Sequence, residues 1–305
     1  MKFKRLFAAV LSMAVMTAAF AGCGSTESES KDNNAGGSDG KTTFTVGFDA
    51  EFPPYGFQDD NGEYVGFDLS LAQEVCDRNG WELVKQPIDW DSKDMELQSG
   101  SIDCIWNGFT MNGREDDYTW TTPYVDNSQV VVVRADAGIN ALSDLAGKIV
   151  IVQADSSALH ALEGDDASDE NKALAATFAE LQQVGDYNTA FLNLASGAAD
   201  AVCLDYGVAA YEVNSRGDEY IILEDNVSTE RYGVGFLKGN TELRDQVQAT
   251  LTKMYNDGTL YRIADDWADR GIDKASLCFD PTDSGSISAG GDDAAEGDAG
   301  EQAAE

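Results

Sequence analysis

The sequence predicts an α/β protein with two lobes, and three observations support this prediction. Apolar, β-rich segments alternate with segments of helical spacing, a rhythm typical of mainly parallel sheets packed by helices. Low-complexity segments flank the alternating region, which spans about 240 residues over 41–280. That length is large for one hydrophobic core, so we expect two lobes, each with its own sheet.

The first half of this region contains three predicted strands and two predicted helices. Residues 42–50 are β-rich, residues 67–80 have helical spacing and a glycine stop, and residues 81–88 are strand-like. A short helix over 91–100 and a strand over 101–106 follow.

The same alternation continues in the second half. We expect strands at 129–134, 147–153 and 200–204, and helices that begin near Ser156, span 187–197 and begin at Tyr206.

Polar residues follow four of the predicted strands. Asp49 comes at the end of the first β-rich segment, and residues 107–114, residues 154–157 and Asp205 each come directly after a predicted strand. A single aspartate in such a place is usually a turn residue or a helix cap. Open α/β sheets, however, bind small ligands beyond the carboxyl ends of their strands, so the four segments together predict a binding site.

The composition excludes several classes of function. The 305 residues include 55 acidic and 20 basic side chains, which gives a net charge of −35. Nucleic-acid binding needs clustered basic residues, so we exclude it. The chain has one histidine, His160, no cysteine pair at metal-ligand spacing and no GxxxxGK[ST] nucleotide loop. We therefore expect no cofactor, no metal ion and no catalytic residue.

The two ends of the chain have distinct roles. Basic residues precede an uncharged stretch over 6–22, about three residues short of the roughly 20 that span a bilayer, which predicts a signal peptide over 1–22. The ending "FAGC" resembles a bacterial lipobox, which implies that Cys23 is lipidated, with palmitate as an expected acyl group; an ordinary signal peptide with an incidental cysteine is the alternative. We expect a flexible tether over 23–40 and an acidic disordered tail over 281–305.

Four cysteines remain after the lipidation site: Cys76, Cys104, Cys203 and Cys278. Cys104 and Cys203 lie inside apolar, strand-like segments, which favours buried thiols. A disulfide is the alternative in an exported protein, and its connectivity does not follow from sequence.

Five segments in a fixed order resemble one family; they are 46–75, 102–124, 147–158, 196–211 and 232–267. On these segments the chain resembles the extracellular amino-acid-binding proteins of bacterial ABC importers of the polar amino acid type (family 3). The resemblance implies a periplasmic-binding-protein type II fold with two α/β lobes and two hinge segments. Lobe 1 would combine 41–127 with 229–280, lobe 2 would span 128–228, and the acidic stretch 163–172 would be a surface insertion of lobe 2.

The resemblance implies that Arg114 binds the carboxylate of an amino acid. A guanidinium can donate to both oxygens of a carboxylate, whereas a buried ion without a partner costs several kcal/mol. A surface arginine paired with residues 115–116 is the alternative. Family members often have one more residue between the threonine and the arginine than Thr110 to Arg114 allows. The shorter loop either displaces the guanidinium or tightens a turn.

Lobe 2 would contribute the next contacts. Ser156 and Ser157 begin a predicted helix, whose unpaired N–H groups and dipole favour the ligand carboxylate. Asp205 would accept the ligand ammonium, and its alternative role is a cap for the helix from Tyr206. Asp155, at a position that is often glycine in the family, is expected to point away as a helix cap.

Lobe 1 would contribute the remaining contacts. By the same resemblance, backbone and hydroxyl hydrogen bonds come from Asn107, Gly108 and Thr110. The mouth of the lobe is lined by Asp49, Phe52 and Tyr55, with Phe52 on the apolar stem of the ligand and Asp49 near its side chain. Carboxylates at that end favour a polar or cationic amino acid.

These features predict a membrane-anchored extracellular protein that captures an amino acid between its lobes and delivers it to the transmembrane subunits of an ABC permease. We expect a monomer that is held to the membrane by its lipid and that is not an enzyme. The alternatives are an amino acid sensor that contacts a receptor and a dehydratase-like enzyme on the same fold.

Overall fold

The structure is a computed structural model that describes residues 42–282. The predicted signal peptide, the predicted lipidation site Cys23, the predicted tether and nearly all of the predicted acidic tail lie outside these residues. Within the described part, no helix combines the length and the apolar character that a membrane span requires.

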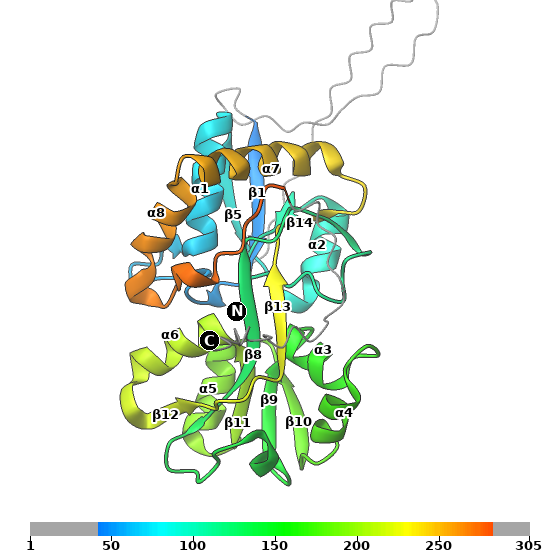
Figure 1. Ribbon diagram of the computed structural model, residues 1–305, viewed down its shortest axis with the longest axis vertical. Coiled ribbons are helices and arrows are strands. Elements are labelled where there is room, and N and C mark those ends of the chain that lie inside the picture. Colours follow the sequence, from blue (N-terminus) through cyan, green and yellow to red (C-terminus); the bar gives the residue numbers. More distant parts are fainter. Residues whose placement is uncertain (1–41, 283–305) are drawn as a thin grey trace, which may run out of the picture. The chain divides into compact units, whose positions relative to one another are not determined.

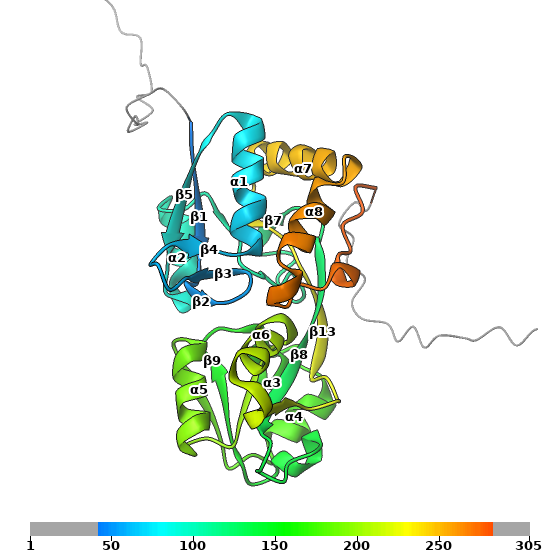
Figure 2. The ribbon, with the colours of Figure 1, turned by 90° about the vertical axis from the view of Figure 1, so that its left-hand side faces the viewer.

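The first sheet contains five strands in the order β5-β1-β6-β14-β7 (Figures 1 and 2). They are β1 (Thr43–Phe48), β5 (Glu82–Pro87), β6 (Cys104–Ile105), β7 (Tyr118–Trp120) and β14 (Gly235–Leu237). β1 pairs in parallel with β5 and β6, whereas β14 pairs antiparallel with β6 and β7. The sheet is therefore mixed and not mainly parallel. β14 enters it after the chain has passed through the second sheet, and it runs in the direction opposite to β6 and β7.

Four helices and a small sheet complete this lobe. The helices are α1 (Phe67–Asn79), α2 (Lys93–Ser99), α7 (Thr241–Asn256) and α8 (Thr259–Asp266). α1 packs against α7 and α8 (Figure 2) and ends at Gly80, whose left-handed backbone (φ 68°) accommodates glycine without a Cβ clash. The small sheet joins β2 (Glu51–Phe52), β3 (Gly56–Gln58) and β4 (Tyr64–Val65).

The second sheet has the order β10-β9-β11-β8-β12, with β13 also paired to β8. Its strands are β8 (Val125–Arg134), β9 (Ile149–Gln153), β10 (Glu180–Val184), β11 (Ala201–Asp205), β12 (Tyr220–Ile222) and β13 (Ser228–Tyr232). β9 pairs in parallel with β10 and β11, whereas β8 is antiparallel to β11, β12 and β13, so this sheet is also mixed. Its helices are α3 (Ser157–Glu163), α4 (Asp169–Ala175), α5 (Tyr187–Ser196) and α6 (Tyr206–Arg216).

Two strands carry the chain between the sheets. β8 and β13 pair antiparallel from Val125 opposite Tyr232 to Gln129 opposite Ser228 and run from one lobe to the other (Figure 1). At the lobe 1 end, Thr110 forms an isolated β-bridge with Tyr232, which fixes the loop after β6 against β13. Residues 127–129 and 228–230 therefore lie at the junction of the two lobes.

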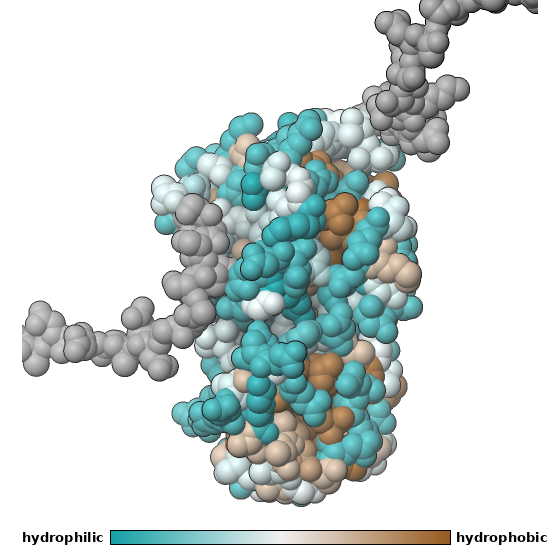
Figure 3. Space-filling model, turned by 90° about the vertical axis from the view of Figure 1, so that its right-hand side faces the viewer, coloured by the Kyte–Doolittle hydropathy of each residue, from teal (hydrophilic) through white to brown (hydrophobic). Residues whose placement is uncertain are grey.

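The surface agrees with the acidic composition. The face drawn in Figure 3 is mostly hydrophilic, with hydrophobic residues in small separate patches. The acidic stretch 163–172 forms a turn after α3 and then the first part of α4, with no buried residue in that helix. Singly exposed apolar residues such as Met95 and Leu192 are ordinary on a protein surface.

Candidate ligand site between the two lobes

A tight turn after β6 positions Arg114. The Arg114 N–H donates to the Met111 carbonyl at 2.9 Å, and Gly113 within the turn has a φ of 76°. The Asn112 Oδ1 accepts from the Arg231 N–H at 2.9 Å, which ties the turn to β13. The short loop thus tightens a turn, and the guanidinium stays in the interior, with the residue 9% exposed.

The guanidinium of Arg114 reaches from lobe 1 to lobe 2. Its Nη1 donates to the Ser157 Oγ at 3.2 Å and to the Thr110 carbonyl at 3.3 Å, and its Nη2 donates to the Asp155 carbonyl at 3.4 Å. The neighbouring acidic residues 115–116 are exposed. All three acceptors are uncharged, so a buried cation is held by neutral oxygens, an environment that favours an added carboxylate.

Ser156, and not Asp155, caps α3, so the expectation for Asp155 is wrong. The Ser156 Oγ accepts from the Leu159 N–H at 3.2 Å. Asp155 has a φ of 55°, a left-handed backbone that costs a non-glycine residue about 1–2 kcal/mol and that explains why glycine suits this position. Its carboxylate faces lobe 1 and accepts from Lys93 and His160.

The Lys93–Asp155 ion pair connects α2 of lobe 1 with the loop after β9 in lobe 2. The Lys93 side chain is 1% exposed and the Asp155 side chain is 40% exposed. Burial acts to raise the pKa of the Asp155 carboxyl, but the His160 and Lys93 hydrogen bonds and the Lys93 charge outweigh it and hold that pKa well below its usual range. Burial lowers the pKa of Lys93, and Asp155 opposes this effect.

Asp205 lies at the end of β11 with 4% exposure. Its Oδ1 accepts from the Tyr232 hydroxyl at 2.5 Å, from the Gln129 Nε2 at 2.9 Å and from the Asn127 Nδ2 at 3.0 Å. α6 begins at Tyr206, but the Asp205 side chain makes no capping hydrogen bond to it. The carboxyl is therefore directed to the junction of the lobes and not to the helix.

Glu230 on β13 was absent from the sequence prediction. It is 6% exposed, and its Oε1 accepts from the Asn127 Nδ2 at 2.7 Å and from the Gln129 Nε2 at 2.8 Å, the two amides that also serve Asp205. Burial, followed by the nearby Glu230 charge, raises the pKa of the Asp205 carboxyl well above its usual value. The available sequence signal was the pair of amides Asn127 and Gln129 at alternate positions in the polar segment that precedes the apolar residues 130–133 of the same strand.

Asp68, also unpredicted, holds the loop after β6. It lies fully buried in the first turn of α1, where its Oδ2 accepts from the Gly108 N–H at 2.6 Å and from the Tyr124 hydroxyl at 2.7 Å. The Gly108 N–H, a predicted ligand donor, is thus already engaged. The Asn107 Oδ1 accepts from the Asp49 N–H at 3.1 Å, while its buried Nδ2 has no partner among the described residues.

Asp49 also connects the lobes. Its Oδ2 accepts from the Gln153 Nε2 of β9 at 2.6 Å, and its Oδ1 accepts from the Glu51 N–H at 2.8 Å. Burial raises the pKa of the Asp49 carboxyl to about 6 despite these hydrogen bonds. Glu51 accepts from Asn188 of α5, a second contact between the lobes.

Phe52 and Tyr55 form an aromatic group with residues of both lobes. The Phe52 ring lies 5.7 Å from Tyr55 and 5.9 Å from Tyr187, and the Tyr55 ring lies 5.3 Å from Tyr232. The Tyr187 hydroxyl is buried without a partner in the described part of the chain. Of these rings, Tyr232 also donates its hydroxyl to Asp205.

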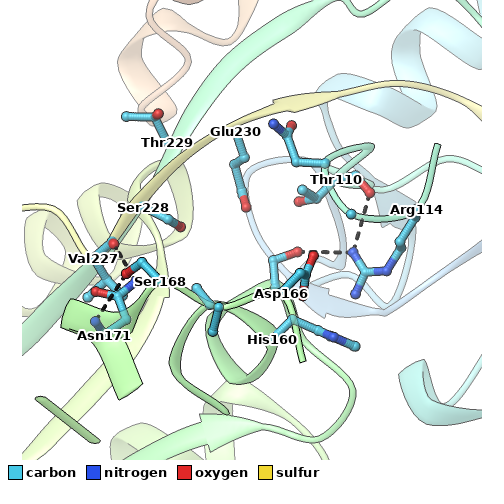
Figure 4. Close-up of a pocket in the computed structure, with 15 residues that line it drawn as sticks. Thr110, Arg114, His160, Asp166, Ser168, Asn171, Val227, Ser228, Thr229 and Glu230 are labelled. Atoms are coloured by element: carbon cyan, nitrogen blue, oxygen red, sulfur yellow. Dashed lines mark hydrogen bonds between the residues drawn. The ribbon is translucent and has the colours of Figure 1, made fainter. Parts of the chain in front are cut away.

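A cavity of about 280 Å³ lies where the loop after β6, α3 and β13 meet (Figure 4). Three predicted ligand residues line it, Thr110, Arg114 and Ser157, and Glu230 points into it from β13 (Figure 4). Asp49 lines a separate hollow of about 670 Å³ together with Glu51 and other acidic residues. The structure thus joins Arg114 and Ser157, two of the three predicted carboxylate-binding residues, in one cavity, whereas Ser156 does not line it and Asp49 lies in another.

Within residues 42–282, no group of three or more His, Cys, Asp or Glu side chains is arranged to hold a metal ion. Cys76, Cys104, Cys203 and Cys278 carry free thiols, and burial raises the pKa of each one.

Residues 44–270 match the family described as bacterial extracellular solute-binding proteins, family 3. The L-cystine-binding protein TcyJ of Escherichia coli (strain K12) is 28% identical over 228 residues, which cover 74% of this chain and 82% of that protein. The arginine-binding extracellular protein ArtP of Bacillus subtilis (strain 168) is 24% identical over 260 residues, which cover 85% of this chain and 96% of that protein.

Solved structures with the same architecture include a substrate-binding protein of an ABC uptake transporter from Streptococcus pneumoniae with bound histidine. It is 31% identical, with a TM-score of 0.71, and the match covers 75% of this chain and 94% of that one. An ancestral arginine-binding protein bound to glutamine is 34% identical, with a TM-score of 0.67 and coverage of 74% and 98%.

Proposed function

Because the chain belongs to the bacterial extracellular solute-binding proteins of family 3, we propose that it captures an amino acid in the cleft between its two lobes. The match to two-lobed solved structures also confirms the predicted fold class, a periplasmic-binding-protein type II fold. We propose that the lobes divide as 41–127 with 229–280 and 128–228, a division that the crossing strands β8 and β13 support.

The observation that carries the proposal is the environment of Arg114. This buried guanidinium lines a cavity and contacts Ser157 of the other lobe, and its hydrogen-bond acceptors are neutral. A carboxylate from an amino acid would accept hydrogen bonds from this guanidinium while contacting both lobes. Asp205, buried at the junction of the lobes, would accept the ammonium of the same molecule.

A polar amino acid is the proposed substrate class. The names and structures of the relatives concern cystine, arginine, histidine and glutamine, all of which have polar side chains or polar termini. Asp49 and Glu51 lie next to the aromatic group and would contact the side chain of the ligand. Phe52 would cover its apolar stem.

We propose that closure of the lobes around the amino acid is the state that an ABC permease recognises. A ligand that contacts both lobes favours the closed form, since its contacts with the second lobe exist only there. The chain would work as a monomer outside the cytoplasm, anchored by a lipid at Cys23, and it would bind rather than transform its ligand. The family and the relatives are binding proteins, in line with this role.

The test is isothermal titration calorimetry of residues 23–305 with the twenty amino acids, ornithine and cystine. Arg114→Ala removes two or more hydrogen bonds to a charged group, worth about 1.5–3 kcal/mol each, so we expect binding to fall below detection. Arg262→Ala, which removes an arginine with 60% side-chain exposure, is the matched control and should titrate like the wild type. Asp205→Asn should weaken every ligand that has an α-ammonium. A normal titration of Arg114→Ala would refute the assignment.

A further inference from the structure

An ion pair crosses between the lobes outside the ligand cavity, from α2 of lobe 1 to the loop after β9 of lobe 2. The Lys93 Nζ donates to the Asp155 Oδ2, and the Lys93 side chain is 1% exposed. The contacts that Asp49 and Glu51 make with lobe 2 each join a carboxylate to a neutral amide. The Lys93–Asp155 contact joins two opposite charges, so separation of the lobes breaks an ion pair in addition to these hydrogen bonds.

Lobe 1 positions the Lys93 ammonium by itself. Lys93 is the first residue of α2, and its Nζ donates to the Trp90 carbonyl at 3.4 Å and lies 5.1 Å from the centroid of the Trp90 ring. A carbonyl and an aromatic ring attract a cation but have no net charge. The ammonium therefore still needs an anion, and lobe 2 supplies it with Asp155.

Lobe 2 directs the Asp155 carboxylate toward lobe 1. Its Oδ1 pairs with the His160 Nε2 at 3.2 Å inside lobe 2, and its Oδ2 accepts from Lys93. The left-handed backbone of Asp155 (φ 55°) is one that glycine would adopt without strain. Such strained positions persist where surrounding contacts determine them, so the aspartate is explained by what its carboxylate contacts.

The ion pair can form and break without unfolding either lobe. Lys93, Asp155 and His160 line a hollow of about 410 Å³, and the Asp155 side chain is 40% exposed. Water can therefore replace each partner when the lobes separate, and the open form does not bury an unpaired charge. In the closed form, by contrast, Lys93 is buried and needs its anion.

The loop that carries Asp155 also contacts the candidate ligand site. The Asp155 carbonyl accepts from the Arg114 Nη2 at 3.4 Å, and the Ser157 Oγ accepts from the Arg114 Nη1 at 3.2 Å. A contact that holds the Asp155 side chain against lobe 1 therefore also holds these two oxygens next to Arg114.

We propose that Lys93 and Asp155 form a latch that keeps a measurable fraction of the ligand-free molecules with the lobes closed. The latch raises the affinity of any ligand that binds between the lobes, because less of the binding free energy is spent on closure. Only this effect on affinity rests on the proposed function, since the latch itself involves no ligand.

The test measures the distance between the lobes in the ligand-free chain (residues 23–305) by single-molecule energy transfer. Dyes are attached through unnatural amino acids at Glu242 on α7 of lobe 1 and at Leu192 on α5 of lobe 2, which are both exposed. Asp155→Asn keeps the size of the side chain but leaves Lys93 with a neutral amide in the closed form. We expect the ratio of closed to open molecules to fall about 3- to 10-fold.

Two further variants identify the ion pair as the cause. Lys93→Met, added to Asp155→Asn, removes the unpaired charge and should restore at least part of the closed-to-open ratio. Asp265→Asn is the matched control, because it removes the anion of an ion pair inside lobe 1, in which the Lys274 Nζ lies 2.8 Å from the Asp265 Oδ2. It should leave the ratio unchanged.

Calorimetry with L-arginine, L-cystine, L-histidine and L-glutamine gives a second readout. Asp155→Asn should weaken every ligand that the wild type binds by one common factor, no larger than the change in the closed-to-open ratio. The inference is overturned if the ratio stays constant in Asp155→Asn, if the double variant recovers nothing, if the control changes the ratio equally, or if the loss of affinity differs between ligands. If the wild type binds no amino acid, the proposed function fails, and the closed-to-open ratio still decides the latch.

Discussion

Asparagine at position 68 should stabilise the protein at high pH relative to the wild type, by an amount that disappears at low pH. Burial raises the pKa of the Asp68 carboxyl from 3.8 to about 7, although the Gly108 N–H and the Tyr124 hydroxyl donate to it. Because the pKa is higher in the folded state than in the unfolded chain, stability is greatest below about pH 3.8 and is lost as the pH rises through about 7. Asparagine at this position cannot ionise and avoids that loss.

The magnitude follows from the interval between the two pKa values. Each pH unit between them changes stability by about 1.4 kcal/mol, so the wild type should lose about 3 kcal/mol between pH 4.5 and pH 7 that Asp68→Asn keeps. The asparagine oxygen can accept both hydrogen bonds. Its amide occupies the place of the unpartnered Oδ1 and costs about 1–2 kcal/mol at every pH. The variant should therefore be more stable than the wild type at pH 8.5 and close to it, or slightly less stable, near pH 4.5.

Urea unfolding followed by circular dichroism at pH 4.5, 5.5, 7.0 and 8.5 gives the difference in free energy at each pH. Asp77→Asn, which makes the same change at an exposed position of the same helix, corrects for the loss of a negative charge from a chain with a net charge of −35. A difference between Asp68→Asn and wild type that stays constant from pH 4.5 to 8.5 would refute the reasoning.

Two further substitutions test the contacts between the lobes. Asp155→Gly relieves a left-handed backbone but leaves the buried Lys93 without its anion, so we expect a net loss of about 1–3 kcal/mol in urea unfolding, with recovery when Lys93→Met is added. If the free energy of unfolding does not recover in the double variant, the role of the ion pair is contradicted. In Gly207→Ala the new Cβ would overlap the Tyr55 hydroxyl across the lobes, so we expect ligand affinity to fall about 10-fold, whereas Gly185→Ala, which meets no atom within 4 Å, should bind normally.

Elements with a strong local pattern were predicted well. The predicted strand at 42–50, helix at 67–80 and strand at 147–153 are confirmed as β1, α1 and β9 with shorter ends. Each combines an apolar core face with a clear stop, such as Gly80, so local sequence is sufficient. The predicted strand at 129–134 is confirmed as the second part of β8, which begins four residues earlier at Val125.

The first part of β8 and all of β13 did not have a strand pattern, for a physical reason. Residues 126–129 are all polar, and β13 reads STERY, so neither has the apolar alternation of a half-buried strand. They are strands because they pair with each other between the lobes, a contact about 100 residues apart in sequence. Local strand propensity carries no information about a contact so distant in sequence. Tertiary pairing therefore determines that these two segments are strands.

The residues of the candidate site also form two groups: those that the sequence could suggest and those that it could not. Arg114 and Asp205 could be proposed because each follows a predicted strand, where open α/β sheets bind small ligands, and because the family resemblance implies their roles. Glu230, Lys93 and Asp68 could not, because each gains its role from a partner in another element: the amides of β8, the loop after β9, and the loop after β6. In the sequence, each of these three residues looks like any charged residue of a strand or a helix, so nothing nearby marks it as part of a site.

The charges of the site explain why a ligand would bring the lobes together. Lobe 1 presents a buried guanidinium that contacts neutral oxygens, and the junction presents two carboxyl groups that contact neutral donors. Either group alone is costly to bury without an opposite charge. A zwitterion of the length of an amino acid can neutralise both at once, but only while Ser157 and Asp205 of the second lobe stay next to the loop of the first. Under the proposed function, the free energy that is recovered by neutralising both charges would depend on closure, so closure would follow from binding.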